Sequence, residues 1–349
     1  MEVGGPFNTI GRRKPLFPVR PELADLLKRH DRIGRSPLAY DDLVRYDGLM
    51  PHVGSDGRDT LWSTVLYRPQ EKQEIDRKLV ETYQMLIADG RAIEHLQVAG
   101  VDLCPYGNSQ PFRVKILNRI NDNHDYFYVK RTDASRVYGL ELEHLLSPNR
   151  MNYMVDGPTL LEEHVIGVPG DTFIAEPGKY GGGVNKVRLC KEFVKFNERC
   201  FVRLLGDMRA YNFVVDVIND VDQVQYRIRS IDLDQQSFEG RLRIYLPQFY
   251  KENLPYVRLS QEVISMETAE QYRNEERSLL RRRWKLAHEN VDDLLNVMAA
   301  DHISLPEHVK QLGEELAVHH GDPEFKECAN MGAILQRHLR TCLGESRYS

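Results

Sequence analysis

The chain has 349 residues, of which 41% are hydrophobic and 28% are charged, and its formal net charge is −5. This is the composition of an ordinary globular protein, and the length is sufficient for two or more lobes with cores of their own. The acidic balance excludes the basic footprint of a nucleic-acid-binding protein, and no apolar run reaches the roughly 20 residues that a membrane span requires.

The five cysteines are odd in number and far apart, and none belongs to a Cys-x-x-Cys pair. Disulfide frameworks and zinc sites normally show cysteines at short, paired spacings, so we expect buried or free thiols. Free thiols are typical of a reducing compartment, and we therefore expect a cytoplasmic protein.

Residues 1–94 are predicted to be an N-terminal arm followed by helices. Three prolines and the lack of periodicity in residues 1–20 predict an irregular arm. Residues 21–88 show helical patterns, most clearly near the end, where apolar side chains recur at helical intervals. These apolar residues are Ile75, Leu79, Tyr83 and Leu86.

Residues 95–166 change to strand periodicity and predict a small β-rich part. Runs rich in β-branched and aromatic residues predict strands at 96–103, 112–117 and 126–130. The turn between the first two strands contains one glycine, Gly107. Its backbone could approach a phosphate, and a plain hairpin turn is equally well supported.

A lysine and two glutamates follow the third strand. Lys130 ends that strand, and residues 136–146 predict a helix. Helical spacing places Glu141 on the side that faces the sheet and Glu143 on the more polar side. A strand-end lysine usually lies in solvent, so Lys130 acquires a functional meaning only from motifs further along the chain.

Two loops come next. A predicted strand runs into Glu163 and Val165, and a turn rich in Gly and Pro then leads to Asp171. The pattern by itself indicates only a strand followed by a turn. Residues 178–183 are rich in glycine but lack the spacing of a phosphate-binding P-loop, so they predict a flexible connection.

Residues 167–259 contain the most informative segment. A long amphipathic helix is predicted at 187–205. Asp207 follows it, with Arg209 two residues later and Asn212 five residues later.

A predicted hairpin follows, with its turn at residues 219–222, and its second strand ends in Asp232 and Asp234. The spacing suits phosphoryl transfer, which needs one carboxylate to accept a hydroxyl proton and further oxygen ligands to hold Mg²⁺ on ATP. Asp234 has two interpretations: a second Mg²⁺ ligand, since residues i and i+2 share a strand face, or a cap for the following turn.

Residues 260–349 are predicted to be a helical C-terminal part, with helices at 260–288, 291–300, 306–318 and 323–342. Acidic residues flank the basic run in the first of these helices. A solvated helix face therefore explains that run better than a binding patch does.

The Gly-Asp-x-x-x-x-Asn motif ending at Asn212 and the Ile-Asp-x-Asp motif ending at Asp234 resemble the protein-kinase-like superfamily, closest in style to its aminoglycoside- and choline-kinase branch. The resemblance covers roughly residues 95–245. It implies an α+β fold of two lobes, a small antiparallel sheet lobe and a mostly helical lobe, with N-terminal and C-terminal helical additions. Leu205 departs from the pattern, because that branch usually has His before Gly-Asp.

In the helical lobe the resemblance implies that Asp207 orients and deprotonates the acceptor hydroxyl. Asn212 and Asp232 would hold Mg²⁺, and Arg209 would contact the γ-phosphate of ATP.

In the smaller lobe the resemblance implies that Lys130 binds the α- and β-phosphates and pairs with a helix glutamate, Glu141 in preference to Glu143. Backbone groups of Glu163 and Val165 would bind the adenine edge. Asp171 would lie near the ribose or the entrance for the acceptor.

The expected function is therefore an ATP- and Mg²⁺-dependent phosphotransferase that acts on a hydroxyl group. The acceptor is not readable from the sequence, and a protein or a small molecule both fit. One alternative is a kinase-like pseudoenzyme that serves as a nucleotide-binding scaffold. Another is an unrelated α+β protein whose aspartates only form turns.

Overall fold

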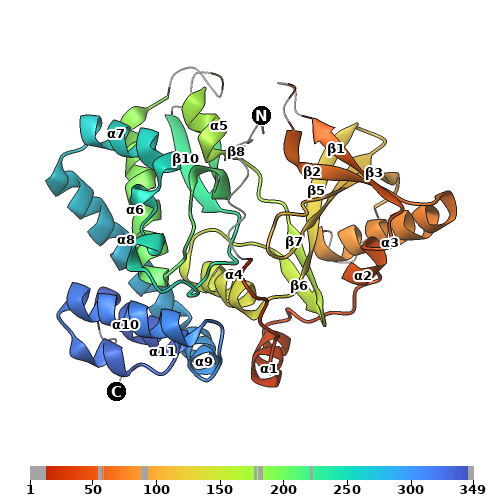
Figure 1. The fold of residues 1–349 in the computed structure, drawn as a ribbon. Helices are drawn as coiled ribbons and strands as arrows, with labels where there is room; N and C mark the ends of the chain where they lie inside the picture. The colour runs from red at the N-terminus through yellow and green to blue at the C-terminus, as the bar shows by residue number, and fades with distance from the viewer. Residues whose placement is uncertain are drawn as a thin grey trace, which may run out of the picture. The chain divides into compact units, whose positions relative to one another are not determined.

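The computed structural model describes residues 13–53, 57, 59–87, 93–176, 179, 184–220 and 223–344. The protein is α+β, as predicted, with a seven-stranded and a three-stranded antiparallel sheet and helices α1 to α11 (Figure 1). Contacts group the residues into two units. Unit 1 contains Ile33–Asp133, Tyr153–Glu163 and the described residues up to Val19, and unit 2 contains the rest.

The seven-stranded sheet belongs to unit 1 and has the strand order β1-β2-β3-β4-β5-β7-β6. Its strands are β1 (Gly48–Val53), β2 (Asp59–Leu66), β3 (Leu96–Leu103), β4 (Phe112–Asn118), β5 (Asn123–Arg131), β6 (Tyr153–Asp156) and β7 (Thr159–Glu163). The three strands predicted between residues 96 and 130 are confirmed as β3, β4 and β5. The helical prediction for residues 21–88 was wrong at β1 and β2, because β1 is mostly exposed and β2 mostly half-buried, so neither shows a buried alternation to recognise.

One face of this sheet carries the core of unit 1. Helix α3 (Pro69–Ile87) packs on it through apolar residues at helical spacing, together with the short helix α2 (Tyr40–Leu43). The inward side chains of β4 and β5 alternate with outward ones, as a half-buried sheet requires. The inward group is Phe112, Val114, Ile116, Phe127 and Val129.

The opposite face of the sheet carries aromatic and charged side chains. The Arg113 guanidinium lies 4.5 Å from the centre of the Trp62 ring and donates a 2.8 Å hydrogen bond to Asp102. Arg113 pairs across the strands with Tyr128, so Lys130, two residues further along β5, lies on this same face.

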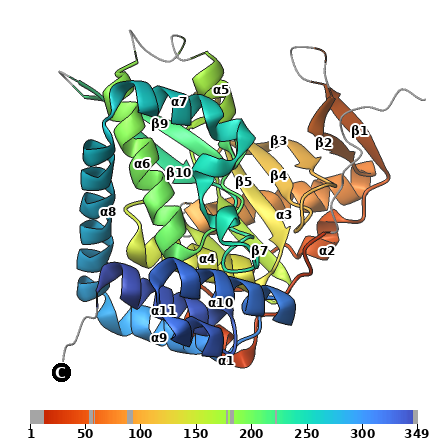
Figure 2. The same ribbon diagram turned by 60° about the vertical axis from the view of Figure 1, so that its left-hand side comes forward.

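Unit 2 is mostly helical. Its central helix, α6 (Lys186–Arg203), packs against α7 (Leu254–Val263), α8 (Met266–Leu286) and β10 (Figure 2). The three-stranded sheet has the order β10-β9-β8. Its strands are β8 (Val168–Pro169), β9 (Phe213–Asp220) and β10 (Gln223–Ser230).

The remaining helices of unit 2 are α1 (Pro21–Arg29), α4 (Ala134–Leu146), α5 (Gly170–Ala175), α9 (His288–Ala299), α10 (Pro306–His320) and α11 (Met331–Leu343). The prediction of one helix at 260–288 was wrong, because Ser265 caps a new helix there, accepting a 3.1 Å hydrogen bond from the Thr268 amide. The helix predicted at 323–342 is likewise divided, into the 3₁₀ helix Pro323–Glu327 and α11.

Some predictions fall outside the described residues. The connection at 178–183 does so except for Lys179, and so do residues 1–12 of the arm and residues 221–222 of the hairpin turn. Within the described part of the chain, no helix is both long enough and apolar enough to cross a membrane.

The contact between α9 and α11 leaves no room for a side chain at Gly332. A Cβ atom added at Gly332 would lie 2.0 Å from the carbonyl oxygen of Met298. We expect Gly332→Ala to lower the free energy of unfolding by at least about 1–3 kcal/mol, the usual cost of overpacking, in denaturant titrations. Gly100→Ala is the control, because no atom lies within 4 Å of its added Cβ. Equal losses of stability in both variants would contradict this contact.

Candidate functional site

The predicted catalytic segment begins where α6 ends. Leu204 takes the left-handed conformation (φ 49°) that terminates the helix, and Asp207 is left-handed as well (φ 56°). The Gly206 amide donates a 3.1 Å hydrogen bond to the Gln235 carbonyl, and the Ser237 amide donates a 2.8 Å hydrogen bond to the Leu204 carbonyl. These bonds join the end of α6 to the loop after β10, and they bring two distant parts of the predicted motif together.

The loop from Asp207 to Asn212 is closed by its own side chains. Asn212 Nδ2 donates a 2.8 Å hydrogen bond to the main-chain oxygen of Asp207 and lies 3.5 Å from its Oδ2. Arg209 Nε donates a 2.7 Å hydrogen bond to Asp207 Oδ1, and Arg209 Nη1 donates a 3.2 Å hydrogen bond to Glu252 Oε1. The Arg209 guanidinium also lies over the Tyr250 ring. Two carboxylates and an aromatic ring therefore hold this guanidinium in place beside Asp207.

Asp232 lies beside this loop. The Ile231 amide donates a 3.1 Å hydrogen bond to the Asn212 carbonyl, which fixes the start of the Asp232 segment against the loop. Arg136 of α4, only 1% exposed, donates a 2.6 Å hydrogen bond to Asp232 Oδ1. The Asp232 side chain is 40% exposed, and its Oδ2 accepts no hydrogen bond from the described residues.

The segment after Asp232 is attached to the N-terminal end of α4. Ser135 Oγ lies 3.1 Å from the main-chain oxygen of Asp234 and 2.8 Å from that of Gln236. Asp234 itself is 6% exposed. The main chain of this segment lies so close to α4 that a Cβ added at Gly139 would be 2.9 Å from the Leu233 carbonyl. Only glycine at that position permits the approach.

The carboxylates of this site influence one another. Burial raises the pKa of Asp207, and the charges of Asp232 and Glu239 raise it further, while Arg209 acts in the opposite direction. The donors near Asp207, namely carboxylate oxygens and the Asn212 amide oxygen, are the hard ligands that Mg²⁺ prefers. The residues present therefore fit a small divalent cation, although Arg136 already occupies one oxygen of Asp232.

The predicted lysine lies in unit 1 and has a carboxylate partner there. Lys130 Nζ donates a 2.6 Å hydrogen bond to Glu162 Oε2, and both residues are buried. In the register of β5 and β7, Lys130 lies opposite Leu160 and Glu162 lies opposite Tyr128, so the ion pair is a diagonal cross-strand contact. Sequence reasoning missed Glu162, and only the strand register could have indicated it.

The two glutamates considered as lysine partners have cationic partners within unit 2. Glu141 accepts hydrogen bonds from His30 Nδ1 at 2.6 Å and from Arg32 Nε at 3.1 Å. Glu143 lies 2.5 Å from Arg203. The prediction that Glu143 lies on a polar side of the helix was wrong, because α4 is buried on all sides and Glu143 is 3% exposed.

The other predicted residues lie as follows. Gly107 is in a tight turn, where an added Cβ would be 2.8 Å from Pro111. Glu163 ends β7, and Val165 is buried shortly after it. The Asp171 carboxylate accepts a 2.7 Å hydrogen bond from the amide of Thr172 at the start of α5, which is a local turn contact.

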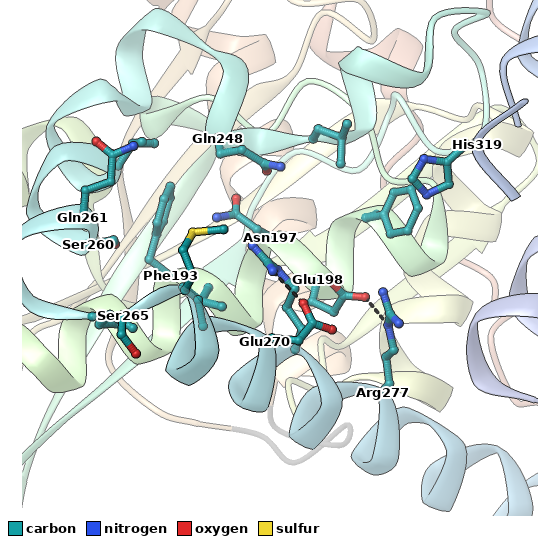
Figure 3. Close-up of a pocket in the computed structure, with 18 residues that line it drawn as sticks. Phe193, Asn197, Glu198, Gln248, Ser260, Gln261, Ser265, Glu270, Arg277 and His319 are labelled. Atoms are coloured by element: carbon teal, nitrogen blue, oxygen red, sulfur yellow. Dashed lines mark hydrogen bonds and ion pairs between the residues drawn. The ribbon is translucent and has the colours of Figure 1, made fainter.

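A separate cavity of about 420 Å³ lies within unit 2 among α6, α7 and α8 (Figure 3). The side-chain oxygens of Asn197 and Gln248 on its walls are buried and have no hydrogen-bond partner in the described part of the chain. The Glu198–Arg277 ion pair also lines it. Apolar walls with a few unsatisfied polar groups are typical of small-molecule sites. The sequence did not indicate this cavity, because its lining comes from several separate helices.

A scan of protein-family models finds no family that matches this chain, and a search of curated proteins finds no similar protein.

The raised pKa of Asp207 has a consequence for stability. A carboxyl group whose pKa is raised on folding favours the folded state while it is neutral, and this contribution is lost as the pH rises through the folded-state pKa. We expect Asp207→Asn to melt at a higher temperature than the wild type near pH 7, with the difference shrinking toward pH ~4, the ordinary range of Asp. Arg209 keeps Glu252 as its partner in this variant.

Thermal melts across this pH range measure the effect. Asp25→Asn, on the exposed side of α1, is the matched control and should follow the wild type. A variant at Asp207 that melts lower than the wild type throughout the range would show that its ion pair with Arg209 outweighs burial.

Proposed function

We propose that this protein is an ATP- and Mg²⁺-dependent phosphotransferase of the protein-kinase-like type, which transfers the γ-phosphoryl group to a hydroxyl of a protein or small-molecule acceptor. The observation that carries the proposal is the joined loop of Asp207, Asn212 and Asp232. Asn212 bonds the main chain of Asp207 through its side chain and the segment of Asp232 through its carbonyl. In the proposed reaction this loop would hold the proton acceptor and the cation ligands in fixed positions, which phosphoryl transfer requires.

The secondary structure of the two units supports the same proposal. Unit 1 is built on an antiparallel sheet, and unit 2 is mostly helical with a small sheet. We propose that these units are the two lobes of a kinase-like fold. All five cysteines are free thiols, which agrees with action in a reducing compartment such as the cytoplasm.

Asp207 would act as the general base. Its Oδ1 is held by Arg209, so Oδ2 would accept the proton of the acceptor hydroxyl. A carboxylate whose pKa is raised by burial is a stronger base than an ordinary one, which improves proton transfer near neutral pH. Arg209 would then chiefly orient Asp207, and a contact between Arg209 and the γ-phosphate is a secondary role.

Asp232 and Asn212 would hold the cation. The Nδ2 of Asn212 is used within the loop, which directs its Oδ1 to a ligand, and Asp232 offers Oδ2. Asp234 would serve as a further ligand or as the cap of the following turn. When bound, Mg²⁺ would neutralise charge on the transferred phosphoryl group.

Lys130 would bind the α- and β-phosphates of ATP. Glu162 holds its ammonium group in place, so we propose Glu162 for the orienting role first expected of Glu141. Main-chain groups of Glu163 and Val165 would bind the adenine.

A kinase-like scaffold that binds nucleotide without turnover is the second candidate. One observation favours it: the carboxylates of Asp207 and Asp232 are both paired with arginines, Arg209 and Arg136. A catalytic site would have to exchange at least the Arg136 contact for a cation. Turnover measurements separate the two candidates.

The cation site is tested by thermal shift with ATP and Mg²⁺. Binding to the folded state raises the melting temperature by mass action. Asp232→Asn should lose the Mg²⁺-dependent part of the shift, because the amide removes the anionic ligand but keeps an acceptor for Arg136. Asp216→Asn, on the neighbouring strand β9, is the matched control and should keep the full shift. An undiminished shift in EDTA would argue against a metal-bridged nucleotide.

Turnover is tested with Asp207→Asn and Lys130→Ala. General bases contribute about 10²–10⁴-fold, so Asp207→Asn should reduce ATP turnover by that factor while the thermal shift with ATP and Mg²⁺ remains. Lys130→Ala should reduce both, because its side chain would touch the nucleotide. If the wild type binds ATP tightly but neither hydrolyses it nor phosphorylates proteins, sugars or aminoalcohols, the scaffold is the correct candidate.

A further inference from the structure

Three side chains with metal-binding atoms meet at the C-terminal helices of unit 2. His320 is the last residue of α10, while His338 and Cys342 lie one turn apart on α11. Residues at this i, i+4 spacing share one face of a helix. One nitrogen of each imidazole and the sulfur of Cys342 all lie within 4.8 Å of one another.

The protein fixes which nitrogen of His338 faces the other two residues. His338 Nε2 lies 3.0 Å from the carbonyl oxygen of Phe201. A carbonyl only accepts, so Nε2 carries the hydrogen and Nδ1 carries the free lone pair. Nδ1 lies 3.0 Å from His320 Nε2. A histidine whose second nitrogen donates to a backbone carbonyl is the usual arrangement of metal ligands.

The spacing of the three atoms is close to that of a zinc site. With Zn–N bonds of about 2.0–2.1 Å and a Zn–S bond of about 2.3 Å, a tetrahedral ion separates two nitrogens by about 3.4 Å and a nitrogen from sulfur by about 3.6 Å. Here Cys342 Sγ lies 3.9 Å from His338 Nδ1 and 3.6 Å from its Nε2. The sulfur thus lies beside the ring, and a bound ion would require it to move toward Nδ1.

Aromatic rings enclose the two imidazoles and hold them in place. His338 is fully buried and lies edge-on to the Phe201 ring, and His320 stacks on Phe325.

We propose that His320 Nε2, His338 Nδ1 and Cys342 Sγ bind one Zn²⁺ ion, with water in the fourth position. Two imidazoles and a thiolate suit zinc better than Mg²⁺ or Ca²⁺, which take oxygen ligands. The Cys342 thiol gives its proton to solvent as the Zn–S bond forms, so binding releases one proton per ion. The ion would fasten the end of α10 to α11, and this site does not depend on the proposed phosphotransferase activity.

The test uses the full chain, stripped with a chelator and then titrated with Zn²⁺ or Co²⁺. We expect one zinc per chain by elemental analysis, a higher melting temperature with zinc, and a thiolate-to-cobalt charge-transfer band in the Co²⁺ form. Cys342→Ser should abolish that band and weaken zinc binding by more than the 10–100-fold typical of an outer-shell partner.

Two neighbouring residues provide matched controls. Cys328→Ser removes another free thiol, and His319→Ala removes the imidazole beside His320. Both variants should keep the band and the affinity. His320→Gln, at the half-buried end of α10, provides a second ligand variant if Cys342→Ser does not fold. The proposal is overturned if the wild type binds no zinc at equimolar concentration, or if the ligand variants bind it as well as the controls.

Discussion

The burial of charged side chains on α4 is the constraint on which unit 2 depends. Every residue from Ala134 to Glu143 is buried, and three of these residues are charged. A buried charge without a partner costs several kcal/mol. Each charged side chain of α4 therefore requires an oppositely charged neighbour. Arg136 is bonded to Asp232, Glu141 is paired with Arg32 just after α1, and Glu143 is paired with Arg203 of α6. The helix thereby determines which segments can surround it.

The candidate site follows from this constraint. The loop after β10 is hydrogen-bonded to α4 on one side and to the end of α6 on the other. These two helices therefore determine its position. Asp207 and Asp232, which are 25 positions apart in the chain, thus share one electrostatic environment. The proposed group transfer would need such positioning on rigid elements, and the same contacts also stabilise the fold.

Periodic patterns in the sequence predicted individual strands and helices well, but they did not predict which side chains contact one another. Strands β3 to β5 and helix α6 alternate or repeat clearly, and their boundaries were found within a few residues. Strands β1 and β2 were missed because β1 is a mostly exposed edge strand and β2, beside it, is mostly half-buried. Glu162, the partner of Lys130, could be found only from the register of β5 and β7. Arg136, the partner of Asp232, could be found only by knowing that α4 is buried. The His320–His338–Cys342 cluster depends on the packing of α10 on α11, which no spacing of cysteines could reveal.

The stacking of Arg113 on Trp62 affects the tryptophan fluorescence of the protein. The chain has two tryptophans, and they fall in different units: Trp62 on the Lys130 face of the unit 1 sheet, and Trp284 in α8 of unit 2. Trp62 is half-buried beneath a guanidinium, whereas Trp284 is 8% exposed and its indole donates to Asp292. Each unit therefore carries a single tryptophan in a distinct environment, so in a variant that keeps only one of the two, tryptophan emission follows one unit without any added label.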